Sequence, residues 1–226
     1  HHPALPLYTE ADARRALTRL DTLGYDDDHD LGGGVTATFR NAGHIIGAAS
    51  IRLRHGGTTI TFSGDLGRPH DPIMRAPAPL AETDYLVVES TYGDRVHDAA
   101  DPADRLADIV NRTAARGGTL VIPAFAVGRA QSLLYYVARL KASKRIPELP
   151  VYLDSPMAIE AGEILLAHRG DHRLSDAECR MLDGAARIVR TADESKSIDH
   201  GRVPSIIVSA SGMATGGRVL HHLKTF

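Results

Sequence analysis

The sequence predicts an α/β protein that is built in two parts, and three observations support this fold class. In residues 1–93, apolar and polar residues alternate with the period of two that is typical of half-buried strands. In residues 94–226, short apolar runs alternate with helical patterns, which favours a parallel sheet with helices on both faces. The chain has 226 residues, of which 43% are hydrophobic and 24% charged, enough for a sizeable core.

The first part opens with a predicted helix and a loop. Residues 9–20 have a helical pattern that Thr9 can cap, and Asp12 lies where a negative charge favours the helix N-terminus. Glycine and aspartate then accumulate over residues 23–34, a composition that predicts a loop.

Strands are predicted for the remainder of the first part. Residues 35–40 form one strand, and residues 50–63 form a hairpin that turns at residues 55–57, His-Gly-Gly. Residues 85–90, YLVVES, are a continuous apolar run that ends in a carboxylate. Such a run is typical of a strand that is covered on both faces, so we expect a buried strand here.

The second part alternates strands with helices. The first of these helices is closed by glycines, as helix C-termini often are. Strands are predicted over residues 119–123, 150–154, 187–190 and 204–209, and helices over residues 102–118, 128–144 and 155–168. A glycine-rich turn then enters a last helix within residues 211–224.

Composition excludes some classes of function. The formal net charge is −2, so the chain as a whole is not a basic nucleic-acid-binding domain, although a local basic groove is still compatible with it. Tryptophan is absent and aromatic residues make up 5%, which disfavours a base-stacking platform. No apolar run is long enough to span a membrane, and the single Cys179 suits a reducing, cytoplasmic location.

Three residues with metal-binding side chains follow predicted strands. His44 lies between Gly43 and Gly47, Asp65 follows the hairpin, and Glu89 ends the apolar run. Each residue alone has an ordinary explanation: a packed histidine, a turn aspartate or an exposed glutamate at a strand end. Together they suit zinc, iron or manganese, because histidine and carboxylates are the ligands that these metals take.

A second cluster, SASGMATGGR, covers residues 209–218 between a predicted strand and a helix. Its serines, glycines and free amides can bind an anion, although an ordinary β-to-α turn explains the composition equally well. No Gly-Lys-Ser/Thr follows, so the cluster is not a Walker A loop. Arg129, which opens the helix after residues 123–128, either faces a phosphate or is solvated. Adjacent helical residues cannot chelate one ion, so His221 and His222 are interpreted as surface or packing residues.

Taken together and in this order, six strings resemble the β-CASP branch of the metallo-β-lactamase superfamily, a family of RNA-processing nucleases. The strings are GHIIGAAS, FSGDLGR, VVESTYGDR, PAFAVGRAQ, YLDSPMA and SASGMATGGRVLHH, and they span nearly the whole chain. The resemblance implies that residues 1–93 form part of a metallo-β-lactamase αββα sandwich. It also implies that residues 94–226 form most of an inserted β-CASP domain.

The resemblance also implies roles for individual residues. His44 would be one zinc ligand, Asp65 the carboxylate that bridges two zinc ions, and Glu89 the acidic residue that orients a catalytic histidine. The loop that contacts RNA phosphate would comprise Ser209, Ser211, Gly212 and Met213.

The family's HxHxDH motif and its two C-terminal histidines are not matched here, so we expect the chain to be the middle of a longer protein. The implied activity of that protein is zinc-dependent hydrolysis of single-stranded RNA, as an endonuclease that could also act as a 5′-to-3′ exonuclease and could form a homodimer. Two alternatives remain open: another hydrolase on the same metal scaffold, and a non-catalytic RNA-binding subunit.

Overall fold

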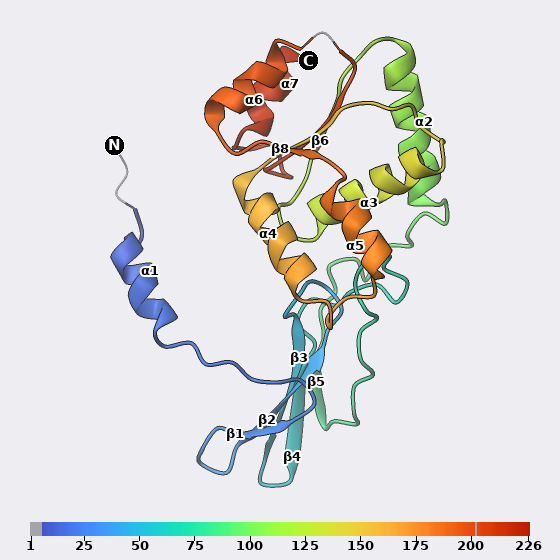
Figure 1. Cartoon of the computed structure of the whole chain (residues 1–226). Helices are drawn as coiled ribbons and strands as arrows, with labels where there is room; N and C mark the ends of the chain where they lie inside the picture. Colours follow the sequence, from blue (N-terminus) through green and yellow to red (C-terminus); the bar gives the residue numbers. More distant parts are fainter. Residues whose placement is uncertain (1–5, 202) are drawn as a thin grey trace.

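The structure is a computed structural model that describes residues 6–201 and 203–226. Two β-sheets organise the chain (Figure 1). A five-stranded sheet forms the lower half of the view, and a four-stranded sheet surrounded by helices forms the upper half. The expected α/β class, with a parallel sheet flanked by helices, is confirmed.

The five-stranded sheet has the spatial order β1-β2-β3-β4-β5. Its strands are β1 (Asp28–Asp30), β2 (Thr36–Asn41), β3 (Ala49–His55), β4 (Thr58–Phe62) and β5 (Tyr85–Val87). The first four strands pair antiparallel, and β5 joins β4 in parallel. The predicted hairpin is confirmed: Ile51 pairs with Phe62, and Gly56 and Gly57 make the turn with positive φ angles of 56° and 83°.

Two expectations for the first part are wrong. The predicted loop over residues 23–34 contains the short strand β1, which Thr38 fixes through a 2.5 Å hydrogen bond from its hydroxyl to Asp28. The run of residues 85–90 is not buried, because Tyr85 and Val87 are 63% and 51% exposed. It forms the edge strand β5, and within the described residues no further layer covers either face of that strand. Apolar composition indicates burial only where the fold supplies a covering layer.

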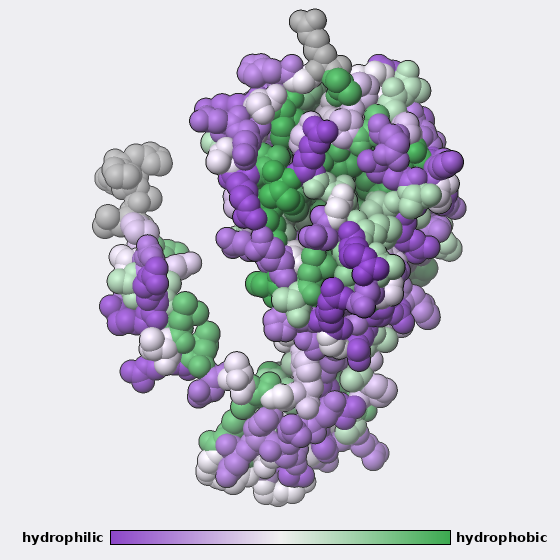
Figure 2. Space-filling model, in the orientation of Figure 1, coloured by the Kyte–Doolittle hydropathy of each residue, from purple (hydrophilic) through white to green (hydrophobic). Residues whose placement is uncertain are grey.

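The first helix, α1 (Glu10–Leu17), stands apart from the rest of the molecule (Figure 1). Thr9 caps it as expected, because its hydroxyl accepts from the Asp12 amide. The Asp12 carboxylate also accepts from the Thr9 amide, which completes a capping box. None of its residues is buried, and Figure 2 shows apolar side chains on the side of α1 that faces the molecule.

The second sheet is entirely parallel and has the order β6-β9-β7-β8. Its strands are β6 (Leu120–Pro123), β7 (Val151–Asp154), β8 (Arg187–Ile188) and β9 (Ile206–Ser209). The helices around it are α2 (Pro102–Ala115), α3 (Arg129–Ala142), α4 (Pro156–Ala167), α5 (Asp176–Asp183), α6 (Ala192–Asp199) and α7 (Val219–Thr225). None of the helices in the described residues is long and apolar enough to cross a lipid bilayer.

Two of these helices, α5 and α6, were missed by the sequence analysis. Both begin with a capping box, in which Ser175 pairs with Glu178 and Thr191 pairs with Glu194. That spacing was visible in the sequence and could have revealed them. The predicted strand over residues 187–190 is shortened to two residues in β8.

The main core lies between the four-stranded sheet and its helices. Ile206 and Val208 of β9 are fully buried and pack with Leu134 and Val137 of α3. Full burial of such a side chain contributes roughly 1.5–3 kcal/mol. The same core takes in Ile73 and Met74, which come from the segment that connects β4 to β5.

Backbone pairing fastens this segment to the helical half. The Arg173 amide donates to the Ile73 carbonyl oxygen at 2.8 Å, and Met74 forms an antiparallel bridge with His172. The two sheets are therefore joined both by shared core residues and by backbone hydrogen bonds, which sets the geometry of the loops between them.

Candidate functional site

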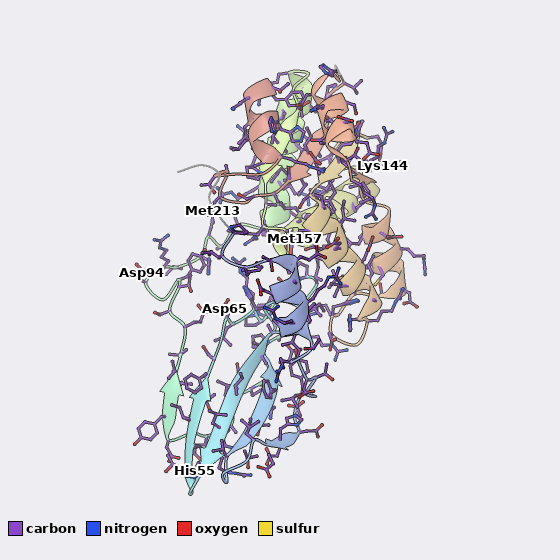
Figure 3. The ribbon with its side chains drawn as sticks, turned by 90° about the vertical axis from the view of Figure 1, so that its left-hand side faces the viewer. His55, Asp65, Asp94, Lys144, Met157 and Met213 are labelled. Atoms are coloured by element: carbon purple, nitrogen blue, oxygen red, sulfur yellow. The ribbon has the colours of Figure 1, made fainter. Side chains whose placement is uncertain are left out.

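Strand direction brings His44, Asp65 and Glu89 to one end of the five-stranded sheet. β2 and β4 are each antiparallel to β3, and β5 is parallel to β4, so β2, β4 and β5 all run the same way. Each of the three residues lies just after the carboxyl end of one of these strands. Figure 3 shows Asp65 between the strand ends and the helical half, with Met213 on the loop above it.

The loops that carry His44 and Asp65 are in backbone contact. The Gly67 amide donates to the Ala42 carbonyl oxygen at 2.8 Å. A Cβ atom on Gly67 would lie 1.8 Å from the Gly43 carbonyl oxygen and 2.8 Å from the His44 amide nitrogen. Gly43 itself has a φ of 66° and leaves no room for a side chain beside the Arg75 carbonyl oxygen. The glycines around the two candidate ligands therefore allow the loops to pack together.

Glu89 links the loop after β5 to the loop that carries Asp65. Its carboxylate accepts from the Leu66 amide at 3.0 Å and from the Thr91 amide at 3.3 Å, and its own amide donates to the Ser63 hydroxyl at 2.9 Å. The hydrogen bond from Leu66, then those from Thr91, and finally the nearby His44 imidazole hold the pKa of Glu89 below its usual range. Glu89 is thus an ionised, half-buried carboxylate beside both candidate ligands.

The His44 and Asp65 side chains fit part of a zinc ligand set. The side chains of His44 and Asp65 are exposed, and imidazole and carboxylate are zinc ligands. Within residues 6–201 and 203–226, no group of three or more histidine, cysteine, aspartate or glutamate side chains could hold a metal. Zinc needs three or four protein ligands, so the described residues alone do not form a complete site.

The glycine-rich loop follows β9 as expected, but Ser209 has a different role from the one the resemblance implied. It is 1% exposed, and its hydroxyl donates to the Asp154 carbonyl oxygen at 2.9 Å. The hydroxyl is turned into the fold and is occupied there. Ser209 therefore fastens the start of the loop instead of presenting its side chain to a ligand.

The next residues of this loop lie against the loop after β6. A Cβ atom on Gly212 would be 2.7 Å from the Phe125 amide nitrogen, so only glycine allows this approach. The Ser211 hydroxyl oxygen is buried and has no hydrogen-bond partner among the described residues. Met213, at the tip, is 68% exposed. Ser211, Gly212 and Met213 thus lie together in one loop.

The segment of residues 124–128 lies between the two clusters and leads to Arg129. Arg129 is exposed at the first position of α3, and its guanidinium makes no ion pair with another residue in the described part of the chain. A Cβ atom on the preceding Gly128 would lie 3.3 Å from the Ile45 side chain, next to His44. The candidate metal loops, the start of α3 and the glycine-rich loop therefore form one continuous surface between the sheets.

A buried charge cluster was missed by the sequence analysis. His222, interpreted there as a surface or packing residue, is fully buried, and its two ring nitrogens lie 2.8 Å from Asp154 and 2.7 Å from Asp199. The Asp154 carboxylate also accepts from Arg218 and from Ser195. Ser195 and Asp199 lie four residues apart on α6, and Arg218 and His222 lie four apart at α7, but Asp154 comes from a distant strand. Helical spacing shows each pair, and only the fold shows that the pairs meet at Asp154.

Comparison with known proteins assigns the family. Residues 130–226 match the Beta-Casp domain. The chain is 33% identical over 229 residues to "Ribonuclease TTHA0252" of Thermus thermophilus, covering 97% of this chain and 52% of the relative. Residues 130–226 belong to the Beta-Casp domain family. The resemblance seen in the sequence is thereby confirmed.

Other relatives of this chain come from archaea and animals. It is 31% identical to an "RNase J-like protein" of Methanocaldococcus jannaschii, covering 96% of this chain and 52% of that protein. It is 30% identical to "Cleavage and polyadenylation specificity factor 73" of Drosophila melanogaster, covering 93% of this chain and 31% of that protein. The chain thus spans about half the length, or less, of these relatives.

Proposed function

We propose that the whole protein is a zinc-dependent ribonuclease that hydrolyses phosphodiester bonds of single-stranded RNA. Within that proposal it is an endonuclease that could also degrade RNA from the 5′ end. The observation that carries the proposal is the meeting of the His44, Asp65 and Glu89 loops at one sheet end, beside the glycine-rich loop. The names of the ribonuclease relatives support the same substrate class.

In this proposal the chain contributes part of the metal site. His44 and Asp65 are two of the zinc ligands, and the remaining ligands come from outside the described residues. Zinc, when bound, supplies Lewis-acid activation of water and stabilises charge on the phosphate. Glu89 holds the Asp65 loop through the Leu66 amide and orients a catalytic histidine supplied from elsewhere in the protein.

The second cluster would bind the RNA backbone. The exposed Arg129 guanidinium can donate two parallel hydrogen bonds to a phosphate. Ser211, Gly212 and Met213 form the facing loop, in which the Ser211 hydroxyl is free to turn toward an anion. Such contacts position the RNA strand without reading its base sequence.

The test is cleavage of end-labelled single-stranded RNA by the intact gene product and by its Asp65→Ala variant, with zinc content measured on both. We expect the variant to lose cleavage by at least roughly a hundredfold, as removal of a metal ligand does. Asp183→Ala is the matched control, because Asp183 is an exposed carboxylate at the end of α5. It should cleave like the wild type.

The alternatives correspond to distinct results. A wild type that is loaded with zinc and leaves RNA uncut would favour another hydrolase on the same scaffold. A zinc-free, inert wild type that still binds RNA would favour a non-catalytic subunit. Homodimer formation and a cytoplasmic location stay predictions, for sedimentation and for cell fractionation respectively.

A further inference from the structure

We propose that Asp154 is a positioning residue that fixes both ends of the 210–217 loop and so holds this loop in place for an RNA phosphate. The inference rests on the proposed function for the identity of the ligand. The positioning itself rests on the contacts of Asp154, which lies at the carboxyl end of β7 and is fully buried.

Asp154 first fixes the entry to the loop. β7 and β9 are parallel neighbours, and Asp154 is directly paired with Ser209 in their register. The Ser209 hydroxyl donates to the Asp154 carbonyl oxygen at 2.9 Å. The backbone of Asp154 therefore holds the last residue before the loop.

The Asp154 side chain fixes the exit. One carboxylate oxygen accepts from the Arg218 guanidinium at 2.6 Å, and Arg218 is the residue that follows the loop. The same guanidinium donates to the carbonyl oxygens of Val189 at 3.2 Å and Arg190 at 2.8 Å. These three hydrogen bonds hold the Arg218 guanidinium to Asp154 and to the backbone after β8, so Arg218 anchors the end of the loop.

The second carboxylate oxygen of Asp154 holds the helix after the loop. It lies 2.8 Å from His222 Nε2, while Nδ1 of that ring lies 2.7 Å from Asp199 of α6. With both nitrogens facing carboxylates, the ring is an imidazolium, and the cluster then has two negative charges and two positive charges. Burial alone would lower the pKa of His222, but the hydrogen bonds that its ring donates to Asp154 and Asp199 outweigh it and raise this pKa.

The loop between these anchors is closed, and it contains a buried side-chain oxygen without a partner among the described residues. Gly217 has a φ of 80°, and a Cβ atom there would lie 2.6 Å from the Ala210 carbonyl oxygen, so the two ends of the loop touch. The Ser211 hydroxyl oxygen, just inside, is buried without a partner among the described residues. An unpaired hydroxyl costs free energy unless a ligand or water satisfies it.

Stability alone is a weak reason for such a cluster. Buried ion pairs often contribute no more stability than apolar residues of similar volume, because the charges lose their hydration. What they can supply is one defined geometry, since a charged pair has few favourable arrangements in a buried site. Here the geometry that is fixed is that of the loop whose Gly212 packs against Ala124 and Phe125, in the segment that leads to Arg129.

The experiment compares Asp154→Asn with Ser195→Ala in the intact protein. Ser195 donates to the same carboxylate at 2.5 Å, but it lies on α6 and forms no hydrogen bond with the described residues of the loop. We expect Asp154→Asn to raise KM for single-stranded RNA by roughly ten- to a hundredfold, more than it lowers kcat, because misplaced binding groups act on positioning. Ser195→Ala should leave KM near the wild-type value. Amide hydrogen exchange over residues 210–217 should accelerate only in Asp154→Asn.

A milder variant keeps the inference testable if Asp154→Asn fails to fold. Loss of the His222 proton breaks its contacts with the two carboxylates and loosens the end of the loop, so KM should rise with pH. Asp199→Asn keeps the Asp154–Arg218 pair and removes one carboxylate from His222, so this rise should begin at lower pH than in the wild type. Equal KM and equal loop exchange in Asp154→Asn and Ser195→Ala would overturn the inference. A wild type that leaves RNA uncut would refute the proposed function and the phosphate ligand, while hydrogen exchange would still decide whether Asp154 fixes the loop.

Discussion

Replacement of His222 by glutamine tests the buried cluster most directly. His222 is fully buried and bridges Asp154 and Asp199 through its two ring nitrogens. Glutamine is of similar size but uncharged, so the variant leaves two carboxylates with Arg218 as their one cation in the cluster. Breaking a buried ion pair by removing one partner typically costs about 3–5 kcal/mol, and we expect a loss of unfolding free energy in that range.

The neighbouring histidine supplies the control. His221 lies on the same helix, α7, but is exposed. His221→Gln should change the free energy of unfolding by no more than about 0.5 kcal/mol, as surface substitutions usually do. Urea denaturation of the wild type and both variants at pH 6.5, followed by far-UV circular dichroism, measures the two differences side by side.

The effect of His222→Gln should also depend on pH in a defined direction. The pKa of His222 is raised in the folded protein, so its contribution to stability is complete below the ordinary histidine pKa of about 6.5. That contribution is lost as the pH rises through the raised value. The stability difference between wild type and His222→Gln should therefore be largest near pH 6 and should narrow on the alkaline side.

Two results would refute this reasoning. One is equal destabilisation by His221→Gln and His222→Gln at pH 6.5, which would mean that the charge cluster contributes nothing beyond packing. The other is a stability difference for His222→Gln that stays constant into the alkaline range, which would mean that His222 is not an imidazolium in the folded chain.

Three further predictions follow from the site. Gly67→Ala should lower the free energy of unfolding by about 1–3 kcal/mol or more, measured by urea denaturation, because the new Cβ atom would lie 1.8 Å from the Gly43 carbonyl oxygen. Gly170→Ala is the control: Gly170 has open space around it, so the free energy of unfolding should hardly change. Glu89→Gln should lower RNA cleavage by the intact protein by about 10–100-fold, because it weakens the hold on the Leu66 amide; unchanged kinetics would contradict the positioning role. The isolated 226-residue chain should hold well under one zinc per chain by atomic absorption at neutral pH, and tight stoichiometric zinc would show that the chain has a complete site.

Much of the fold was predictable because local pattern and local chemistry agree. The hairpin of β3 and β4 was indicated by alternation around Gly56 and Gly57, and the start of α1 by Thr9 and Asp12. The edge position of β5 was not predictable, because an apolar run does not say whether another layer of the protein covers it. The short strand β1 was hidden by its polar composition, which local rules assign to loops.

The candidate site was predictable in part. Glycines beside His44 and Asp65 indicated close backbone approach, and the structure shows what approaches: the two loops themselves, through Gly43 and Gly67. That Glu89 faces the same end of the sheet follows from strand direction, which the sequence does not state. Ser209 had the expected place in the chain, but its hydroxyl is turned inward by the pairing of β9 with β7.

The sequence by itself determined the α/β class, most element positions and the identity of the candidate ligands, because these depend on periodicity, capping and side-chain chemistry. Only the tertiary structure decided which distant residues meet. His222 and Asp154 are 68 positions apart, and no local pattern distinguishes the buried His222 from the exposed His221 beside it. Burial and charge pairing across parallel strands and their crossover helices are properties of the packed chain, so they become visible only when the strands are placed side by side.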